Sequence, residues 1–278
     1  MQTDIIELAP FEARHLEEAV ALSHAAGWPH RKKDWAMVWA LSEGRVALAG
    51  DRVVGTAMMT PFGETCATVN LIIVDQKMRG RGLGRRLTTA AIDLADDREC
   101  RLVATTDGLP VYEKLGFRRT HEIRQHQGLV APIQAPRDVE WADGKDLKSL
   151  VDLDAAAFAA DRGDLFAVLA SEGQFAVIRD QGRIVAFAAV RPFGRGEVVG
   201  PAVGQNADQA RALISFILAS RKDQFVRIDV AGQNDLSPWL ESLGLGAVDG
   251  GIAMTRGGPG QREPATVQTF ALASQALG

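Results

Sequence analysis

The chain has 278 residues, of which 46% are hydrophobic and 24% are charged, and its formal net charge is −4. This composition is typical of a folded globular protein and excludes a disordered chain. The slight acidic excess excludes a broad electrostatic attraction to nucleic acid or to an anionic membrane surface. The length predicts two compact domains of ordinary size.

The chain's 2 cysteines, Cys66 and Cys100, show neither C-x-x-C spacing nor the density of a disulfide-rich secreted protein. The N-terminal residues, Met1 to Glu7, lack the basic start and apolar core of a secretory signal. Apolar stretches such as 212–219 fall well short of the roughly 20 residues that a membrane-spanning helix needs. We therefore expect a cytoplasmic protein that binds neither membrane nor nucleic acid.

The first half predicts a strand, two helices, three strands, and then a helix, a strand, a helix and a strand. Apolar residues at helical spacing indicate the helices, and Gly50-Asp51-Arg52 between two apolar segments indicates a hairpin. Pro110 is typical of a first helical turn, and Gly116 of a helix end. The expected helices are 16–23, 35–39, 83–94 and 110–115, and the expected strands after the first are 45–49, 53–59, 68–74, 101–105 and 117–123.

The second half repeats this order of elements. Before it, the segment from Gly128 to Pro136 has no periodicity and carries two prolines, which predicts a crossing between domains. The repeat distance of about 130 residues suits two copies of one domain rather than a solenoid. We expect helices at 147–158, 165–169 and 210–217, strands at 175–178, 184–190, 197–203 and 225–230, and a last strand near 266–272 after a flexible segment at 257–261. The predicted domains are 1–127 and 137–278.

A buried strand, a glycine loop and a helix start follow one another between Leu71 and Leu87. Glycines allow close approach of the backbone, and the free N–H groups and dipole of a helix start favour a phosphate. No Gly-Lys-Ser/Thr follows, and the spacing from Gly80 to Gly84 does not match a dinucleotide fingerprint. The pattern therefore predicts a site for another pyrophosphate compound, although ligand-free turns also use such glycines.

The loop Arg79-Gly80-Arg81-Gly82-Leu83-Gly84 resembles the signature of the GNAT superfamily of N-acetyltransferases, which is Arg or Gln, two residues, Gly, one residue, and Gly or Ala. The second signature of that family, an aromatic residue before a short helix end and Gly-Phe, is matched by Tyr112-Glu113-Lys114-Leu115-Gly116-Phe117. The resemblance implies an α/β fold, an α+β mixed sheet with two tandem GNAT-like domains. It also implies acetyl-CoA as the acyl donor, with no metal.

The resemblance further implies a role for each matching residue. The pantetheine of acetyl-CoA would pair with the backbone of Ile72, Ile73 and Val74, where an N–H could stabilise the oxyanion. Tyr112, the 1 tyrosine of the chain, would protonate the departing thiolate, the alternative being a half-buried anchor. The pyrophosphate would rest on Arg79, Gly80, Arg81, Gly82, Leu83, Gly84 and Arg85.

The general base is left open by the sequence. The strand 101–105 lacks the glutamate that some family members carry, and Thr105 stands where asparagine is frequent. Glu64, His30 and Asp75 are candidates, and a water relay is an equal alternative. The segment Gly27-Trp28-Pro29-His30-Arg31 lies where this fold gathers acceptor residues, although it also suits an ordinary turn.

The second half lacks the residues that carry this chemistry. Its segment from Gly200 to Ala210 has neither the arginine nor the glycine pair, and aligning Leu115-Gly116 with Leu243-Gly244 puts Leu240 at the position of Tyr112. The run Phe193-Gly194-Arg195-Gly196 precedes a strand, which predicts a turn and not a phosphate loop. We therefore expect a degenerate copy that shapes the acceptor pocket or a subunit contact.

Together these patterns predict direct transfer of an acetyl group from acetyl-CoA to a primary amine of a small molecule, within a ternary complex. Two alternatives remain at this point: a non-catalytic protein that senses or binds acyl-CoA, and a protein N-acetyltransferase. The sequence does not identify the amine or decide whether the chain forms a homodimer.

Overall fold

The computed structural model describes residues 6–258 and 265–278. The expectations for the first five residues and for Pro259 to Gln261 lie outside the described residues. The chain forms two compact units. The N-terminal unit extends to Arg119 and includes Met254–Gly258, and the C-terminal unit contains Thr120–Ala253 and most of the C-terminal segment.

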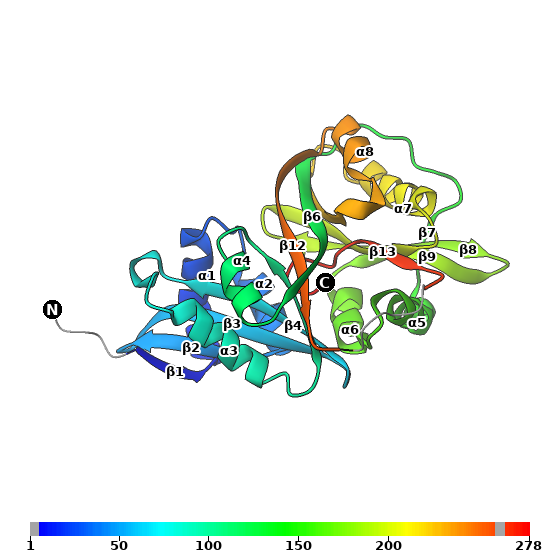
Figure 1. Ribbon diagram of the computed structural model, residues 1–278. Coiled ribbons are helices and arrows are strands. Elements are labelled where there is room, and N and C mark those ends of the chain that lie inside the picture. Colours follow the sequence, from blue (N-terminus) through cyan, green and yellow to red (C-terminus); the bar gives the residue numbers. More distant parts are fainter. Residues whose placement is uncertain (1–5, 259–264) are drawn as a thin grey trace. The chain divides into compact units, whose positions relative to one another are not determined.

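The N-terminal unit has the predicted order of elements (Figure 1). Its sheet has the order β1-β2-β3-β4-β5, in which only β4 and β5 are parallel. The elements are β1 (Ile6–Pro10), α1 (Leu16–Ala25), α2 (Lys32–Ala40), β2 (Glu43–Ala49), β3 (Arg52–Phe62), β4 (Cys66–Val74), α3 (Leu83–Asp93), β5 (Glu99–Ala104) and α4 (Leu109–Lys114).

Helices cover both faces of this sheet because β3 presents alternate side chains to each face. On one face, a Cβ on Gly55 would lie 2.7 Å from Cδ1 of Leu87, so only glycine lets α3 approach β3 this closely. On the other face, Met58 packs beside Phe11, which stacks on the fully buried Trp35 of α2 with ring centroids 5.8 Å apart. The α3 face and the α1–α2 face are therefore distinct sides of the sheet.

The C-terminal unit repeats this order, as the sequence predicts. Its helices are α5 (Leu147–Phe158), α6 (Gly163–Glu172), α7 (Ala207–Ala219) and α8 (Ser237–Ser242). Its strands are β6 (Arg118–Leu129), β7 (Glu140–Trp141), β8 (Gln174–Asp180), β9 (Arg183–Phe193), β10 (Gly196–Gly204), β11 (Phe225–Ala231), β12 (Gly246–Arg256) and β13 (Gln268–Ala271). The turn predicted at Phe193 to Gly196 is present between β9 and β10.

The strands at the ends of the two repeats differ from the sequence expectation. β6 is longer than the predicted strand 117–123, and its second half pairs with β11, from Ile123 with Ala231 to Leu129 with Phe225. Gly128 and Leu129, at the start of the predicted crossing between domains, therefore belong to strand β6. β12 was not predicted, because its residues are mostly exposed or half-buried and carry no clear apolar alternation. The limits 1–127 and 137–278 stay a prediction for the boundary between the repeats.

The end of β12 belongs to the N-terminal unit, beside β5. There Thr255 Oγ1 donates a hydrogen bond to Oε1 of the buried Glu99 at 2.7 Å, and Arg101 pairs with the same carboxylate at 3.3 Å. The strand after α4 thus pairs in the second unit, and the strand after α8 ends in the first. Non-local pairing of this kind leaves little trace in a local sequence pattern.

Candidate active site

The parallel strands β4 and β5 separate partway along their length. Their pairing is confined to three positions at the strand starts, from Cys66 with Glu99 to Thr68 with Arg101. Beyond Thr68, the edge of β4 that faces β5 has no strand partner among the described residues. Unpaired backbone donors and acceptors on such an edge can bind an extended ligand by adding it as a strand.

A bulge marks the start of this open segment. Leu71 has a φ of 45°, which is rare for a residue with a side chain, and the register with β3 shifts between Asn70 and Ile73. Thr56 holds the bulge, because its Oγ1 donates to the Leu71 carbonyl at 2.7 Å. The predicted pantetheine-binding residues Ile72, Ile73 and Val74 therefore all lie on the open part of β4.

The glycine loop leads from the end of β4 to the N-terminus of α3. Gly80 and Gly82 have φ values of 77° and 73°, and a Cβ on either would meet nothing within 4 Å, so glycine is required there by backbone conformation. Gly82 is the N-cap and offers no side chain to cap the helix. The first-turn N–H groups of α3 are consequently available to an anion.

Positive charge surrounds this uncapped helix start. Arg79, Arg81 and Arg85 are exposed, and the first turn of α3 carries no acidic residue. Arg79 lies 3.5 Å from the carboxylate of Asp107, and both side chains are more than half exposed, so a doubly charged pyrophosphate could compete for it. The helix dipole and the arginines both favour a negative charge, so the loop has the electrostatics of a phosphate site.

Tyr112 is buried in α4 with its hydroxyl unpartnered. Its ring packs over Gly108, where a Cβ would lie 2.6 Å from Cε2, and edge-on to Phe117 with centroids 6.1 Å apart. Among the described residues, no hydrogen-bond partner meets its hydroxyl. Burial raises the pKa of Tyr112 to about 12. At neutral pH the hydroxyl is protonated, as any tyrosine is, and so has a proton to give.

Because Tyr112 is the single tyrosine in the sequence, alkaline titration of tyrosinate absorbance reports on this residue alone. We expect a midpoint near 12 in the folded protein and near about 10 in urea. The unfolded chain then loses this proton first, so the free energy of unfolding falls as the pH rises from about 10 to 12, by about 3 kcal/mol at most. A folded-state midpoint at or below 10 would contradict the effect of burial on the pKa of Tyr112.

The base candidates from the sequence differ in position. Asp75 receives a hydrogen bond from the Lys77 N–H at 2.9 Å and pairs with Arg52 at 2.7 Å. These two contacts hold the pKa of Asp75 below its ordinary value, which suits a loop anchor better than a base. Glu64 precedes the far end of β4, and roughly 15 Å or more of strand separates it from the bulge at Leu71.

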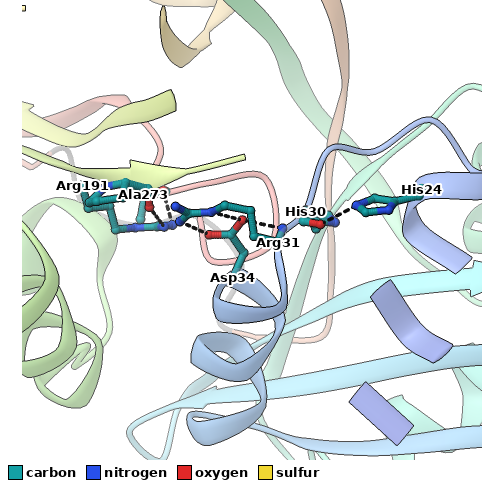
Figure 2. Close-up of polar contacts among 7 residues, drawn as sticks. His24, His30, Arg31, Asp34, Arg191 and Ala273 are labelled. Carbon is teal, nitrogen blue, oxygen red and sulfur yellow. Dashed lines mark hydrogen bonds and ion pairs between the residues drawn. The ribbon is translucent and has the colours of Figure 1, made fainter. Parts of the chain in front are cut away.

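His30 lies in the connection between α1 and α2. Side-chain contacts of neighbouring residues hold this connection in place (Figure 2). The His30 carbonyl accepts a hydrogen bond from His24 Nε2 at 2.8 Å, and Nδ1 of the His30 ring lies 3.2 Å from Ser23 Oγ. Arg31 donates to the Asp34 carboxylate at the start of α2 from its side chain, at 2.7 and 3.1 Å, and from its backbone N–H, at 2.8 Å. These contacts hold the backbone of the α1–α2 connection in one conformation.

The C-terminal unit has the same strand separation, but its own chain fills it. β10 and β11 pair in parallel only at Glu197 with Val226 and Val198 with Arg227. Beyond that point β13 lies between them, with Ala271 in register with both Ala202 and Val230. The backbone edge that remains open in the first unit is therefore hydrogen-bonded in the second.

The remaining features of the second unit also differ. The N-terminus of α7 is capped, because the Asn206 side chain accepts from the Gln209 N–H at 3.0 Å, and Asp208 puts a negative charge in the first turn. Leu240 occupies the place of Tyr112: its carbonyl accepts from Leu245 at 3.1 Å, as that of Tyr112 accepts from Phe117 at 3.0 Å. Within the described residues, the first unit alone combines an open strand edge, an uncapped helix start and a tyrosine.

One polar residue beside the opening escaped sequence reasoning. Asn70 is buried in β4 next to the bulge, and its side-chain oxygen has no hydrogen-bond partner in the described ranges. The available signal was a lone amide within the apolar run from Val69 to Val74. Its burial and its unpaired oxygen emerge only from the folded structure.

Two further observations concern the whole of the described chain, residues 6–258 and 265–278. None of the helices there has the length and apolarity that a membrane span requires. Nor do three or more His, Cys, Asp or Glu side chains gather there in a way that could hold a metal ion.

Comparison with known proteins agrees with this geometry. The family model described as Acetyltransferase (GNAT) family matches residues 6–117, and that described as Acetyltransferase (GNAT) domain matches residues 150–268. The chain belongs to the GNAT acetyltransferase family and carries two GNAT domains in tandem. It is thus an acyltransferase of that family, with the mixed α/β fold expected from its two signatures.

Individual relatives resemble nearly the whole chain. An uncharacterized N-acetyltransferase of Bacillus subtilis (strain 168), YitH, is 28% identical over 239 residues, which cover 82% of this chain and 83% of that protein. A candidate acetyltransferase from Pyrococcus horikoshii has a TM-score of 0.82 at 16% identity, over 100% of this chain and 98% of that one. A tandem GNAT protein from the clavulanic acid biosynthesis pathway has a TM-score of 0.62 at 17% identity, over 92% and 100%. The structural likenesses describe the fold alone.

Proposed function

We propose that the chain transfers an acetyl group from acetyl-CoA to a primary amine of a small molecule, at one site in the N-terminal unit. The observation that carries the proposal is the opening between β4 and β5, which runs directly into the uncapped, arginine-flanked start of α3. An extended chain ending in a pyrophosphate matches both parts. Acetyl-CoA has this form, and GNAT enzymes use acyl-CoA donors.

The donor would be held mainly by backbone groups. The open edge at Ile72 to Val74 would pair with the pantetheine amides, and the first-turn N–H groups of α3 would bind the pyrophosphate. A β4 N–H near Ile73 or Val74 would stabilise the negative oxygen formed during attack on the thioester. These contacts need no titratable side chain, in keeping with the apolar composition of β4.

The transfer itself needs two proton movements. The amine nitrogen attacks the thioester carbon, a C–N bond forms, the C–S bond breaks, and the bonding electron pair stays on sulfur. Tyr112 supplies the proton that converts the departing thiolate to the thiol, and its tyrosinate regains a proton from solvent. The proton lost by the amine nitrogen passes to water, so the net products are an acetamide and CoA.

The experiment combines calorimetry with turnover. We expect acetyl-CoA to bind with a stoichiometry of one per chain, because β13 and the capped α7 close the equivalent site of the second unit. CoA release should then be measured across a panel of small primary amines, with a lysine-containing peptide alongside.

Each outcome distinguishes the proposal from its alternatives. Turnover with a small amine supports it, and turnover with the peptide alone would favour a protein N-acetyltransferase instead. Tight binding of acetyl-CoA with no turnover for any acceptor would indicate an acyl-CoA-binding protein. A stoichiometry of two would overturn the assignment of a single site.

A further inference from the structure

A small cluster of polar side chains lies beside the opening: Thr60 on β3 and Thr68 and Asn70 on β4 are buried, and Ser42, just before β2, is half-buried. Nδ2 of Asn70 lies 2.9 Å from Thr60 Oγ1 and 3.2 Å from Thr68 Oγ1, and it approaches the Thr68 carbonyl at 3.4 Å. Ser42 Oγ in turn lies 2.6 Å from Thr60 Oγ1. The nitrogen end of the Asn70 amide is therefore held from three directions.

The oxygen end of the same amide has no such contacts. Asn70 is only 6% exposed, and its Oδ1 has no hydrogen-bond partner among the described residues. A flipped amide would not remove the mismatch: the Thr68 carbonyl can only accept, so the end facing it is the nitrogen. Buried acceptors are nearly always satisfied in proteins, so this oxygen is open to a donor from outside the chain, either an ordered water or a bound molecule that displaces it.

The position of this oxygen in the sheet indicates which donor that is. Asn70 lies two residues beyond the last β4–β5 pair at Thr68, on the open part of β4, and two residues before Ile72. Its partner across the ladder is Met58, which packs beside Phe11 on the α1–α2 face. Residues directly opposite on antiparallel strands share a face, so Asn70 lies on the side away from α3 and the glycine loop.

We infer that Asn70 is an acceptor-positioning residue whose Oδ1 takes a hydrogen bond from the attacking amine. The inference rests on the proposed acetyl transfer and names the group that orients its second substrate. A neutral primary amine has two N–H bonds and one lone pair. Donating one N–H to Oδ1 fixes the nitrogen beside the open strand, so that its lone pair can be directed at the thioester carbon.

The chemistry of an amide sets a limit on this role. An asparagine side chain does not take up a proton at neutral pH, so Asn70 orients the amine without acting as its base. No carboxylate belongs to the cluster, which consists of Ser42, Thr60, Thr68 and Asn70. The site would therefore select the uncharged form of the amine, and kcat/KM should rise with pH up to the pKa of the acceptor itself.

The test compares three full-length proteins with the best amine found by the turnover screen. Asn70→Leu, which keeps the size but removes the acceptor atom, should raise the KM for the amine at least tenfold and leave the KM for acetyl-CoA within about twofold. Asn70→Asp keeps an oxygen acceptor but puts its second oxygen in place of Nδ2, against the Thr68 carbonyl, so it should recover only part of the amine KM. Its carboxylate should also add a second ionisation to the acid side of the pH profile, where the wild-type profile carries only the deprotonation of the amine.

A matched control removes an asparagine elsewhere. Asn206→Leu deletes the cap of α7 in the second unit and should lower thermal stability while leaving both KM values unchanged. A structural role of Asn70 would lower stability and alter both KM values, without rescue by Asn70→Asp. If wild type acetylates amines but Asn70→Leu keeps the wild-type amine KM, the inference is wrong and the proposed function stands. If wild type acetylates no acceptor, the proposed function fails, and the inference with it.

Discussion

Replacing Tyr112 by phenylalanine is expected to lower kcat at least about 100-fold and to leave the KM for acetyl-CoA unchanged, since general acid catalysis contributes about 10²- to 10⁴-fold. The hydroxyl is protonated at working pH, as an ordinary tyrosine is, and burial raises the pKa of Tyr112 further, to about 12. Its only effect on the reaction would be on the departing thiolate, which exists only as the C–S bond breaks. Steady-state measurement of CoA release, with the amine and acetyl-CoA varied in turn, checks this split.

The same variant carries its own structural control. The Tyr112 hydroxyl has no hydrogen-bond partner in the described part of the chain, so phenylalanine leaves no partner unsatisfied and should keep or slightly raise the melting temperature. The high pKa also means that wild-type kcat has no alkaline limb from this residue below about pH 11. A kcat within threefold of wild type would show that the tyrosine is an anchor and that water protonates the thiolate.

Replacing Gly82 by aspartate should weaken acetyl-CoA binding roughly 100-fold, because a carboxylate placed against the pyrophosphate costs several kcal/mol in like-charge repulsion. Gly82 is the N-cap of α3, with a φ of 73° and open space where a Cβ would stand. Aspartate is among the residues that best tolerate this left-handed conformation, so the helix itself should remain. Calorimetric titration with acetyl-CoA measures the effect.

Gly182 provides the matched substitution for this test. It has a φ of 78°, nothing within 4 Å of its Cβ position, and a place in the β8–β9 turn of the C-terminal unit. Gly182→Asp should produce a similar loss of stability, about 1 kcal/mol, with acetyl-CoA affinity unchanged. Equal affinity losses in both variants would mean that strain, and not charge at the phosphate site, explains the effect of Gly82→Asp.

Local sequence was sufficient for most elements and for the two signatures. Helix α3 was predicted from one apolar stripe, and Leu83, Leu87 and Ala91 of that stripe are buried. Gly80 and Gly82 were expected to give the loop its backbone freedom, and both have positive φ. Such features depend on residues close in sequence, through helical periodicity and backbone conformation. One sequence taken alone can therefore reveal them.

Other features depend on partners far away in the chain. Nothing local indicates that β6 pairs with β11, that the end of β12 lies beside β5, or that β13 fills the gap between β10 and β11. The degeneracy of the second half was predicted from missing residues, whereas the structure adds a different physical reason: the backbone edge needed for an extended ligand is already paired. Strand pairing between distant segments is decided by packing and register, which no sequence window contains.

The glycine loop, Tyr112 and the duplication were thus determined by the sequence itself, because the first two depend on neighbouring residues and the third on a repeated order of elements. The tertiary structure decided which of the two strand openings stays free, and it brought Asn70 to the edge of that opening with an unsatisfied oxygen. The sequence does not show on which face of the sheet the side chain of a polar residue in an apolar strand lies. Its face, its burial and its missing partner exist only once β3, β4 and the α1–α2 face have come together.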